Sequence, residues 1–262
     1  MAQKLALITG ASSGIGEAFA RQLAEQRHDL CITGRRSENL TVIAAEISEK
    51  YKVRVKSIAA DLATEEGIKQ IETWIEENPA ITMLVNNAGF GIRGAFARKP
   101  IQKYTEMLNV HVNATVRLTS AVLPAMIKAG HGAIINVSSI TAYMPLAGNA
   151  VYAGTKSFLN SFTQSLSYEL RKTGVKVQIL APGFTYSDFH KRPDYSHLNT
   201  YTSVPKFLWM TSEQVAKISL SALESNKLEC IPGWINKMIV LAGKCGFAGI
   251  GSALMSRRYK EG

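Results

Sequence analysis

A tyrosine and a lysine four residues apart, Tyr152 and Lys156, stand out in the sequence, and Ser139 lies thirteen residues before the tyrosine. On a helix, residues four apart share one face. A nearby ammonium group stabilises a phenolate, so we expect the pKa of Tyr152 to fall from about 10 towards neutrality. Such a tyrosine could exchange a proton near pH 7, while the Ser139 hydroxyl holds a carbonyl oxygen. Most tyrosine–lysine pairs at this spacing are surface pairs, so the surrounding elements decide.

The length and composition indicate one globular domain that covers residues 1–262. The chain is 46% hydrophobic, which suits an α/β domain with a sizeable core. Its three cysteines, Cys31, Cys230 and Cys245, are widely spaced and form no CxxC pair. We therefore expect reduced thiols in a cytoplasmic protein, with no disulfide framework and no metal site.

The chain is strongly basic, because it contains 30 lysines and arginines but only 20 acidic residues, which gives a net charge of +10. The basic residues are spread along the chain rather than gathered in one run, which gives little support to nucleic-acid binding. A basic surface favours anionic ligands, such as a phosphorylated cofactor, an acyl carrier or a lipid headgroup.

A glycine-rich turn follows the first apolar run. Residues 4–9 suit a buried parallel strand, and Gly10, Gly14 and Gly16 then lead into a helical pattern. Strand, glycine turn and helix together predict a dinucleotide site, because the helix N-terminus directs its free N–H groups at a pyrophosphate. Ser12 or Ser13 would cap that helix or contact phosphate.

Two further strands point to the adenosine end of a dinucleotide. The strand predicted over residues 28–34 is followed by Arg35, where a carboxylate would otherwise bind the ribose. An arginine there suits a 2′-phosphate and favours NADP over NAD. We interpret Arg36 as an exposed residue at a helix start. Asp61, after the strand predicted over 53–60, would either accept a hydrogen bond from adenine or cap the helix that begins after Thr64.

The second half repeats this alternation. Strands are predicted at residues 83–85, 132–137, 176–180 and 228–231, and helices at 100–128, 150–171 and 212–225. Each candidate site residue falls at the carboxyl end of a strand or at a nearby helix start, where ligands bind in open α/β sheets.

In this order and spacing the sequence resembles the short-chain dehydrogenase/reductase family. The resemblance spans residues 5–185 and rests on TGxxxGxG from Thr9 to Gly16, the Asp61-Leu62 pair, the NNAG run from Asn86 to Gly89, Ser139, YxxxK from Tyr152 to Lys156, and Pro182-Gly183. It implies a Rossmann-type doubly wound, mostly parallel seven-stranded sheet with helices on both faces. Residues 186–262 match loosely and look like broadly labelled oxoacyl- or steroid-dehydrogenase-like members.

The resemblance also implies a role for each matching residue. Tyr152 would be the acid/base, Ser139 would steady the substrate oxygen, and Lys156 would lower the pKa of Tyr152 and hold the nicotinamide ribose. The cofactor, NADP, would contact residues from the glycine turn to the sixth strand: Gly10, Ser12, Ser13, Gly14, Ile15 and Gly16 at the pyrophosphate, Arg35 at the 2′-phosphate, Asp61 and Leu62 at adenine, Asn87, Ala88 and Gly89 at the adenosine ribose, and Pro182, Gly183 and Thr185 at the nicotinamide amide. Members of the family are usually dimers or tetramers.

One position departs from the family pattern. A fourth catalytic residue, an asparagine on the long helix, aligns with His111, and Asn113 follows two residues later. Two residues are about 200° of helix rotation, so only one of them can face the site. We favour His111, which would hold a water chain to Lys156 and bring a group that titrates near pH 6.5 into the proton relay.

The C-terminal part suggests a lid and an extension. Residues 184–211 form a long aromatic-rich segment, read as a lid over a hydrophobic substrate, although its aromatics could simply pack it onto the domain. His190 and His197 are expected to be exposed. Residues 234–262 form a C-terminal extension, of which residues 235–255 are mostly apolar but too interrupted for a transmembrane helix. The extension would pack on a subunit neighbour or over the pocket or, with Arg257-Arg258, lie on a membrane surface.

The leading hypothesis is therefore an NADP-dependent oxidoreductase that interconverts a carbonyl and an alcohol, with Tyr152 as acid/base and a small, hydrophobic substrate. Two alternatives remain open. One is a catalytically inactive dinucleotide-binding regulator, which the complete set of Ser139, Tyr152 and Lys156 argues against. The other is a lipid or oxoacyl reductase on a membrane surface.

Overall fold

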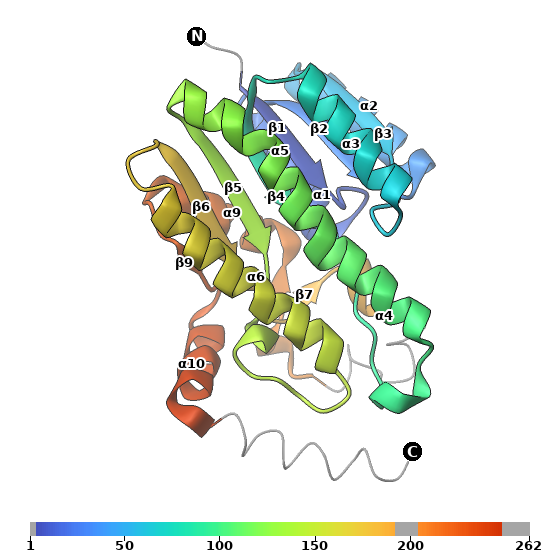
Figure 1. Cartoon of the computed structure of the whole chain (residues 1–262), viewed down its shortest axis with the longest axis vertical. Coiled ribbons are helices and arrows are strands. Elements are labelled where there is room, and N and C mark those ends of the chain that lie inside the picture. The colour runs from blue at the N-terminus through green and yellow to red at the C-terminus, as the bar shows by residue number, and fades with distance from the viewer. Residues whose placement is uncertain (1–3, 192–203, 248–262) are drawn as a thin grey trace.

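The central sheet has seven strands, all paired in parallel, in a computed structural model that describes residues 4–191 and 204–247 (Figure 1). Their spatial order is β3 (Val55–Ala59), β2 (Asp29–Gly34), β1 (Leu5–Thr9), β4 (Ile81–Asn86), β5 (Gly132–Val137), β6 (Val175–Leu180) and β9 (Glu229–Cys230). The order reverses between β1 and β4, which leaves a crevice at the carboxyl ends of these strands. The predicted doubly wound sheet is confirmed.

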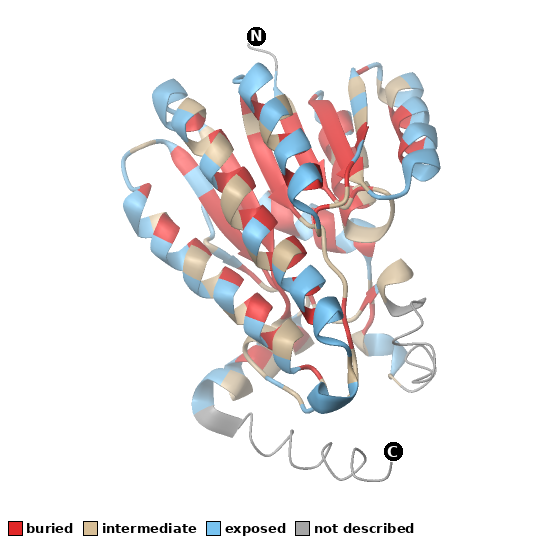
Figure 2. Ribbon diagram, turned by 45° about the vertical axis from the view of Figure 1, so that its right-hand side comes forward, coloured by how far each residue is buried: buried red, intermediate tan, exposed pale blue. Residues whose placement is uncertain are grey.

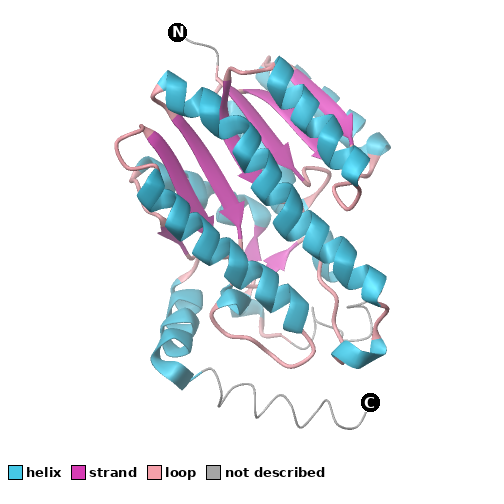
Figure 3. Ribbon diagram, viewed as in Figure 1, coloured by secondary structure: helices cyan, strands magenta, loops and turns pink. Residues whose placement is uncertain are grey.

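Helices cover both faces of this sheet (Figure 3). One face packs on α1 (Gly14–Glu25), α2 (Ser37–Tyr51) and α9 (Ser212–Glu224), and the other on α3 (Glu65–Glu77), α5 (Ala114–Ala129) and α6 (Ala150–Glu169). Alternate residues of each strand point to opposite faces, so Ile8 joins the first core and Leu7 the second. The inner strands β1, β2, β4 and β5 are consequently buried on both sides, whereas the edge strand β3 is only partly buried (Figure 2).

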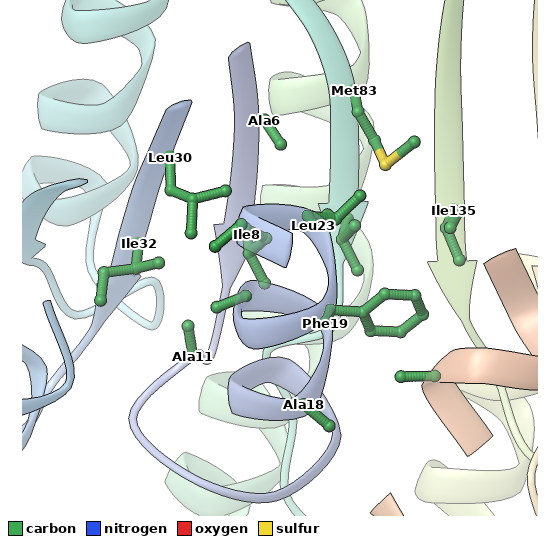
Figure 4. Close-up of a cluster of buried hydrophobic side chains, with 14 of the residues drawn as sticks. Ala6, Ile8, Ala11, Ala18, Phe19, Leu23, Leu30, Ile32, Met83 and Ile135 are labelled. Carbon is green, nitrogen blue, oxygen red and sulfur yellow. The ribbon is translucent and has the colours of Figure 1, made fainter. Parts of the chain in front are cut away.

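The glycine turn is held in place by the first core. Phe19 and Leu23 of α1 lie over Ala6 and Ile8 of β1, with Leu30 of β2 beside them (Figure 4). Phe19, Leu23 and Ile8 are fully buried. Burying each such side chain contributes about 1.5–3 kcal/mol, so the start of α1 is fixed against the end of β1.

The helix predicted over residues 100–128 is interrupted by a change of helix type. It consists of α4 (Ile101–Leu108), a π-helical turn η2 (Asn109–Asn113) and α5, preceded by a short 3-10 turn η1 (Phe96–Arg98). A π turn takes in an extra residue and changes which side chains share a face, and it often marks a functional position.

The segment after β6 is less regular. The strands β7 (Thr185–Tyr186) and β8 (Met210–Thr211) pair in parallel. The short turns η3 (Ile140–Ala142), η4 (Asp188–Lys191) and η5 (Lys206–Leu208) each contribute residues to the lining of the crevice. The helix α10 (Trp234–Ala242) and the turn η6 (Gly243–Phe247) follow β9. The expectations for His197 and for Arg257-Arg258 lie outside the described residues. Within residues 4–191 and 204–247, no helix has the length and apolar character needed to cross a membrane.

Candidate active site

A cavity of about 1430 Å³ opens at the carboxyl ends of the central strands and brings the predicted site residues together. The glycine turn and Arg35 lie at one end, and Ser139, Tyr152 and Lys156 line the other. Nearly every predicted site residue lines this cavity, namely Gly10, Ser12, Ser13, Gly14, Ile15, Arg35, Asp61, Leu62, Asn87, Ala88, Gly89, Ser139, Tyr152, Lys156, Pro182, Gly183 and Thr185. Gly16 and His111 are buried and do not line the cavity.

Strand β5 and helix α6 position the three residues that the sequence predicts to be catalytic. The Ser139 hydroxyl hydrogen-bonds the Tyr152 phenol and accepts from the Thr141 N–H at 3.2 Å. The Lys156 ammonium donates to the Val137 carbonyl at 2.8 Å and lies 5.7 Å from the centre of the Tyr152 ring. The Ser138 hydroxyl donates back to the Lys156 carbonyl at 3.0 Å. These reciprocal bonds fix the first turns of α6 against the end of β5.

The predicted fall in the pKa of Tyr152 is wrong for the protein on its own. Burial raises the pKa of Tyr152 to about 12, although the hydrogen bond from Ser139 opposes the rise. Burial also lowers the pKa of Lys156 to about 7, so the lysine loses much of the charge that was expected to stabilise a phenolate. At neutral pH the tyrosine is therefore a phenol that can donate its proton.

The π turn directs His111 inward, where it is 1% exposed, whereas Asn113 is exposed to solvent. The Phe90 N–H donates to Nε2 of His111 at 3.0 Å. Nδ1 lies 2.9 Å from the Thr155 hydroxyl, which itself donates to the Tyr152 carbonyl at 2.8 Å. Because the hydroxyl hydrogen is used in that bond, Nδ1 must donate, and the ring is the neutral Nδ1–H form.

This arrangement corrects the expectation that His111 holds a water chain to Lys156. Both ring nitrogens are already bonded within the protein, so the side chain has no nitrogen left for a proton relay. Its ring instead packs edge-on against Tyr152, with 5.7 Å between ring centres. His111 connects the loop after β4 with the first turn of α6, and so positions Tyr152.

The glycine turn fits a pyrophosphate. Gly10 has a φ of +67°, which side chains rarely adopt, and a Cβ on Gly16 would collide with the Gly10 carbonyl. The Asn87 amide donates to the Thr9 and Gly10 carbonyls at 2.9 and 3.1 Å, which ties the end of β4 to the turn. Ser13 precedes α1 without capping it through its side chain. Backbone and helix end thus form a cradle of the shape that a dinucleotide requires.

At the end of β2, Arg35 and Asp61 face each other. The Arg35 side chain is half exposed, and its Nη1 lies 3.9 Å from Oδ2 of Asp61. The other carboxylate oxygen of Asp61 accepts from the Ala63 N–H at 3.0 Å. Thr64 caps α3 by accepting from the Gly67 N–H at 3.1 Å. The helix cap is therefore Thr64, and Asp61 remains on the cavity wall.

Arg36 has a larger part in the site than its interpretation as an exposed helix-start residue suggests. Its guanidinium donates to the Ser12 and Ser13 hydroxyls, the latter at 2.6 Å, and forms an ion pair with Asp188 at 3.0 Å. It thus joins the glycine turn to η4. The only sequence signal for this role of Arg36 is the pair of adjacent arginines after β2, because nothing in the sequence relates Arg36 to Asp188.

The described part of the aromatic segment packs on itself and also reaches the cavity. Tyr186 stacks on Trp209 with 4.8 Å between ring centres, and Phe184 lies 5.3 Å from Trp209, so these three rings pack together. Phe189 instead lies 5.9 Å from the Tyr152 ring and lines the cavity. The Ile140 N–H donates to the Pro182 carbonyl at 3.1 Å, which joins the residues just before this segment to the loop that carries Ser139.

Comparison with known proteins places this geometry in a family. A model of the short chain dehydrogenase family matches residues 4–195. Sulfoacetaldehyde reductase 2 from Chromohalobacter salexigens is 37% identical over 195 residues, which cover 71% of this chain and 74% of that protein. A short-chain dehydrogenase from Sphingobium yanoikuyae in complex with NADPH has a TM-score of 0.83 at 29% identity, covering 97% of this chain and 95% of that one.

A second solved structure is similar over nearly the same length. The bulky-bulky ketone specific alcohol dehydrogenase from Comamonas testosteroni has a TM-score of 0.80 at 28% identity and covers 95% of each chain. The family match covers most of the chain, and the fold and cavity agree with it. The chain therefore belongs to the short-chain dehydrogenase/reductase family and is an oxidoreductase.

Proposed function

We propose that this enzyme interconverts a carbonyl compound and its alcohol by hydride transfer with NADP(H), with Tyr152 as acid/base. The observation that carries the proposal is the meeting of Ser139, Tyr152 and Lys156 at one end of a cavity whose other end is a glycine cradle. We further propose that it acts in the cytoplasm as a homodimer or homotetramer.

The residues suit a reduction. When bound, the nicotinamide supplies the hydride. The Ser139 hydroxyl holds the carbonyl oxygen, and the Tyr152 phenol, whose pKa is raised to about 12, donates its proton as negative charge develops there. Lys156, whose pKa is lowered to about 7, can exchange protons at neutral pH close to the Tyr152 ring. Burial of both groups keeps the proton transfer out of bulk water.

Preference for NADP is supported by two arginines at the end of β2. Arg35 lines the cavity and Arg36 covers the serines of the glycine turn, so two guanidinium groups lie where a 2′-phosphate would bind. The Sphingobium yanoikuyae structure, which contains NADPH, is consistent with this choice.

Titration of the wild-type enzyme and Arg35→Ala with NADPH and NADH tests this preference. We expect the wild type to bind NADPH at least tenfold more tightly, and the variant to lose most of that preference while its affinity for NADH stays the same. Equal affinities in the wild type would contradict the NADP assignment. An Arg171→Ala variant, altered at an exposed arginine remote from the cavity, serves as the control.

A substrate with a substantial apolar part is supported by the lining beyond Tyr152. Met144, Leu146, Phe189 and Leu208 form much of that wall. The substrates in the names of the relatives range in size from sulfoacetaldehyde to bulky ketones. The chemistry of the wall, rather than the names, therefore favours an apolar substrate body.

Replacing Tyr152 with Phe tests the reaction itself. The variant keeps the ring and its packing but removes the proton donor, so we expect turnover of carbonyl compounds to fall by at least a thousandfold while NADPH still binds. The thermal midpoint of the variant, measured in parallel, shows whether the fold is retained. A Tyr152→Phe enzyme with near-normal turnover would contradict the assignment of Tyr152 as the acid/base.

A further inference from the structure

The helix α10 lies beyond residue 195, where the match to the family model ends, yet it packs on the turn that follows β6. Asn236 of α10 is 4% exposed, and its Nδ2 donates to the Pro232 carbonyl at 2.7 Å. A Cβ on Gly183 would lie 2.3 Å from Oδ1 of Asn236, so the side chain of Asn236 packs directly on the Gly183 backbone. This end of α10 therefore rests on the Pro182-Gly183 turn, which lines the cavity.

The other end of α10 packs equally closely on the loop between β5 and α6. A Cβ on Gly243, the residue after α10, would lie 2.6 Å from the Tyr143 carbonyl oxygen and 2.8 Å from Cγ of Met144. The Tyr143 hydroxyl donates to the Glu229 carboxylate of β9, which also accepts from the Lys244 ammonium at 3.0 Å. The same ammonium lies 4.9 Å from the centre of the Tyr143 ring. These contacts hold the end of α10 against the loop that carries the catalytic serine.

This packing gives α10 one side towards the domain and one side towards solvent. Asn236 and Val240, one turn apart, are buried. The exposed side carries Trp234, Met238 and Leu241. Ile239 is only partly exposed and lies next to the buried pair. Among residues 234–242, all of which the structure describes, Ile239 alone lines the cavity that contains the catalytic residues.

We infer that α10 is a wall of the substrate site and that Ile239 sets the size of the substrate body that this site accepts. This inference rests on the proposed function, because it names the residue that determines substrate size in that same site. Since α10 is packed closely at both of its ends, the wall cannot move outwards without loss of these contacts. A larger side chain at position 239 should therefore exclude large substrates, and a smaller one should admit them.

Two neutral aldehydes that differ by one phenyl ring test the inference: benzaldehyde and biphenyl-4-carboxaldehyde. The quantity compared is kcat/KM with NADPH for the larger aldehyde, divided by that for the smaller one. Ile239→Phe should lower this ratio at least tenfold, since one methylene in an apolar pocket alters selectivity by about 10–200-fold. Ile239→Ala should raise the ratio. Met238→Phe, changed at the neighbouring exposed position of α10, is the control and should keep the wild-type ratio.

Binding without turnover separates failure of this inference from failure of the proposed function. In the Tyr152→Phe background with NADPH, Ile239→Phe should weaken binding of the larger aldehyde at least tenfold more than binding of benzaldehyde. Such a shift without wild-type turnover would contradict the oxidoreductase proposal alone. Thermal midpoints show which variants retain the fold, and Ile239→Ala still tests the inference if Ile239→Phe unfolds. Ratios within about twofold of the wild type for the folded Ile239 variants, or an equal shift in Met238→Phe, would overturn the role of Ile239.

Discussion

The hydrogen bonds of His111 predict how the enzyme responds when this one residue changes. The ring holds the loop at Phe90 and, through Thr155, the turn that carries Tyr152. His111→Ala should lower kcat by roughly ten- to a hundredfold, because small displacements of a reacting group cost that much. KM for NADPH should change little. The pH profile of kcat should keep its shape, since the ring nitrogens take no part in proton transfer.

Two further variants decide between positioning and proton relay. His111→Gln retains a side chain with both a donor and an acceptor, so it should recover part of the lost kcat. Asn113→Ala, on the exposed side of the same π turn, should behave like the wild type. If His111→Ala instead removes an ionisation near pH 6.5 from the profile, His111 acts as a relay after all.

At the scale of elements, a buried polar network joins two strands to two helices below the site. The Asn86 amide of β4 donates to Asn136 of β5 at 2.9 Å and to Thr119 of α5 at 3.2 Å. The Asn136 amide donates to Thr163 of α6 at 2.8 Å. Every member is buried and bonded, so the network fixes how α6, with Tyr152 and Lys156, lies on the sheet.

Asn136→Ala should therefore destabilise the protein strongly. It leaves the Asn86 amide without one acceptor and Thr163 without a donor, at a cost of about 1–3 kcal/mol for each unsatisfied buried group. We expect the free energy of unfolding in urea to fall by about 2–4 kcal/mol. Asn39→Ala, at an exposed position in α2, should change it by less than about 0.5 kcal/mol. A loss for Asn136→Ala no larger than that would show that the network does not hold α6.

At the scale of the whole molecule, the sequence predicts the features that depend on short local patterns, but not the properties that depend on burial. The apolar runs and the glycine turn predict the strands, the helices and the cavity edge, because their signals lie within a few neighbouring residues. The pKa of Tyr152 depends on how much of the domain surrounds it, so spacing from Lys156 alone gives the wrong direction. Local spacing likewise gives neither the ion pair of Arg36 with Asp188, which are 152 residues apart, nor the π turn at His111, whose ring bonds Phe90 and Thr155.

Burial of His28 should make the stability of the whole protein depend on pH. The residue is buried at the start of β2, its Nδ1 has no hydrogen-bond partner among the described residues, and burial, with a smaller contribution from the Lys4 charge, lowers its pKa to about 4. Since an unfolded histidine titrates near 6.5, the unfolded chain binds more protons between these values. Stability should therefore fall as the pH drops from about 6.5 to 4.

In urea titrations across this range, the stability of His28→Gln should fall less steeply than that of the wild type. His131→Gln, at an exposed histidine, should follow the wild type, and equal slopes for both variants would contradict the assignment.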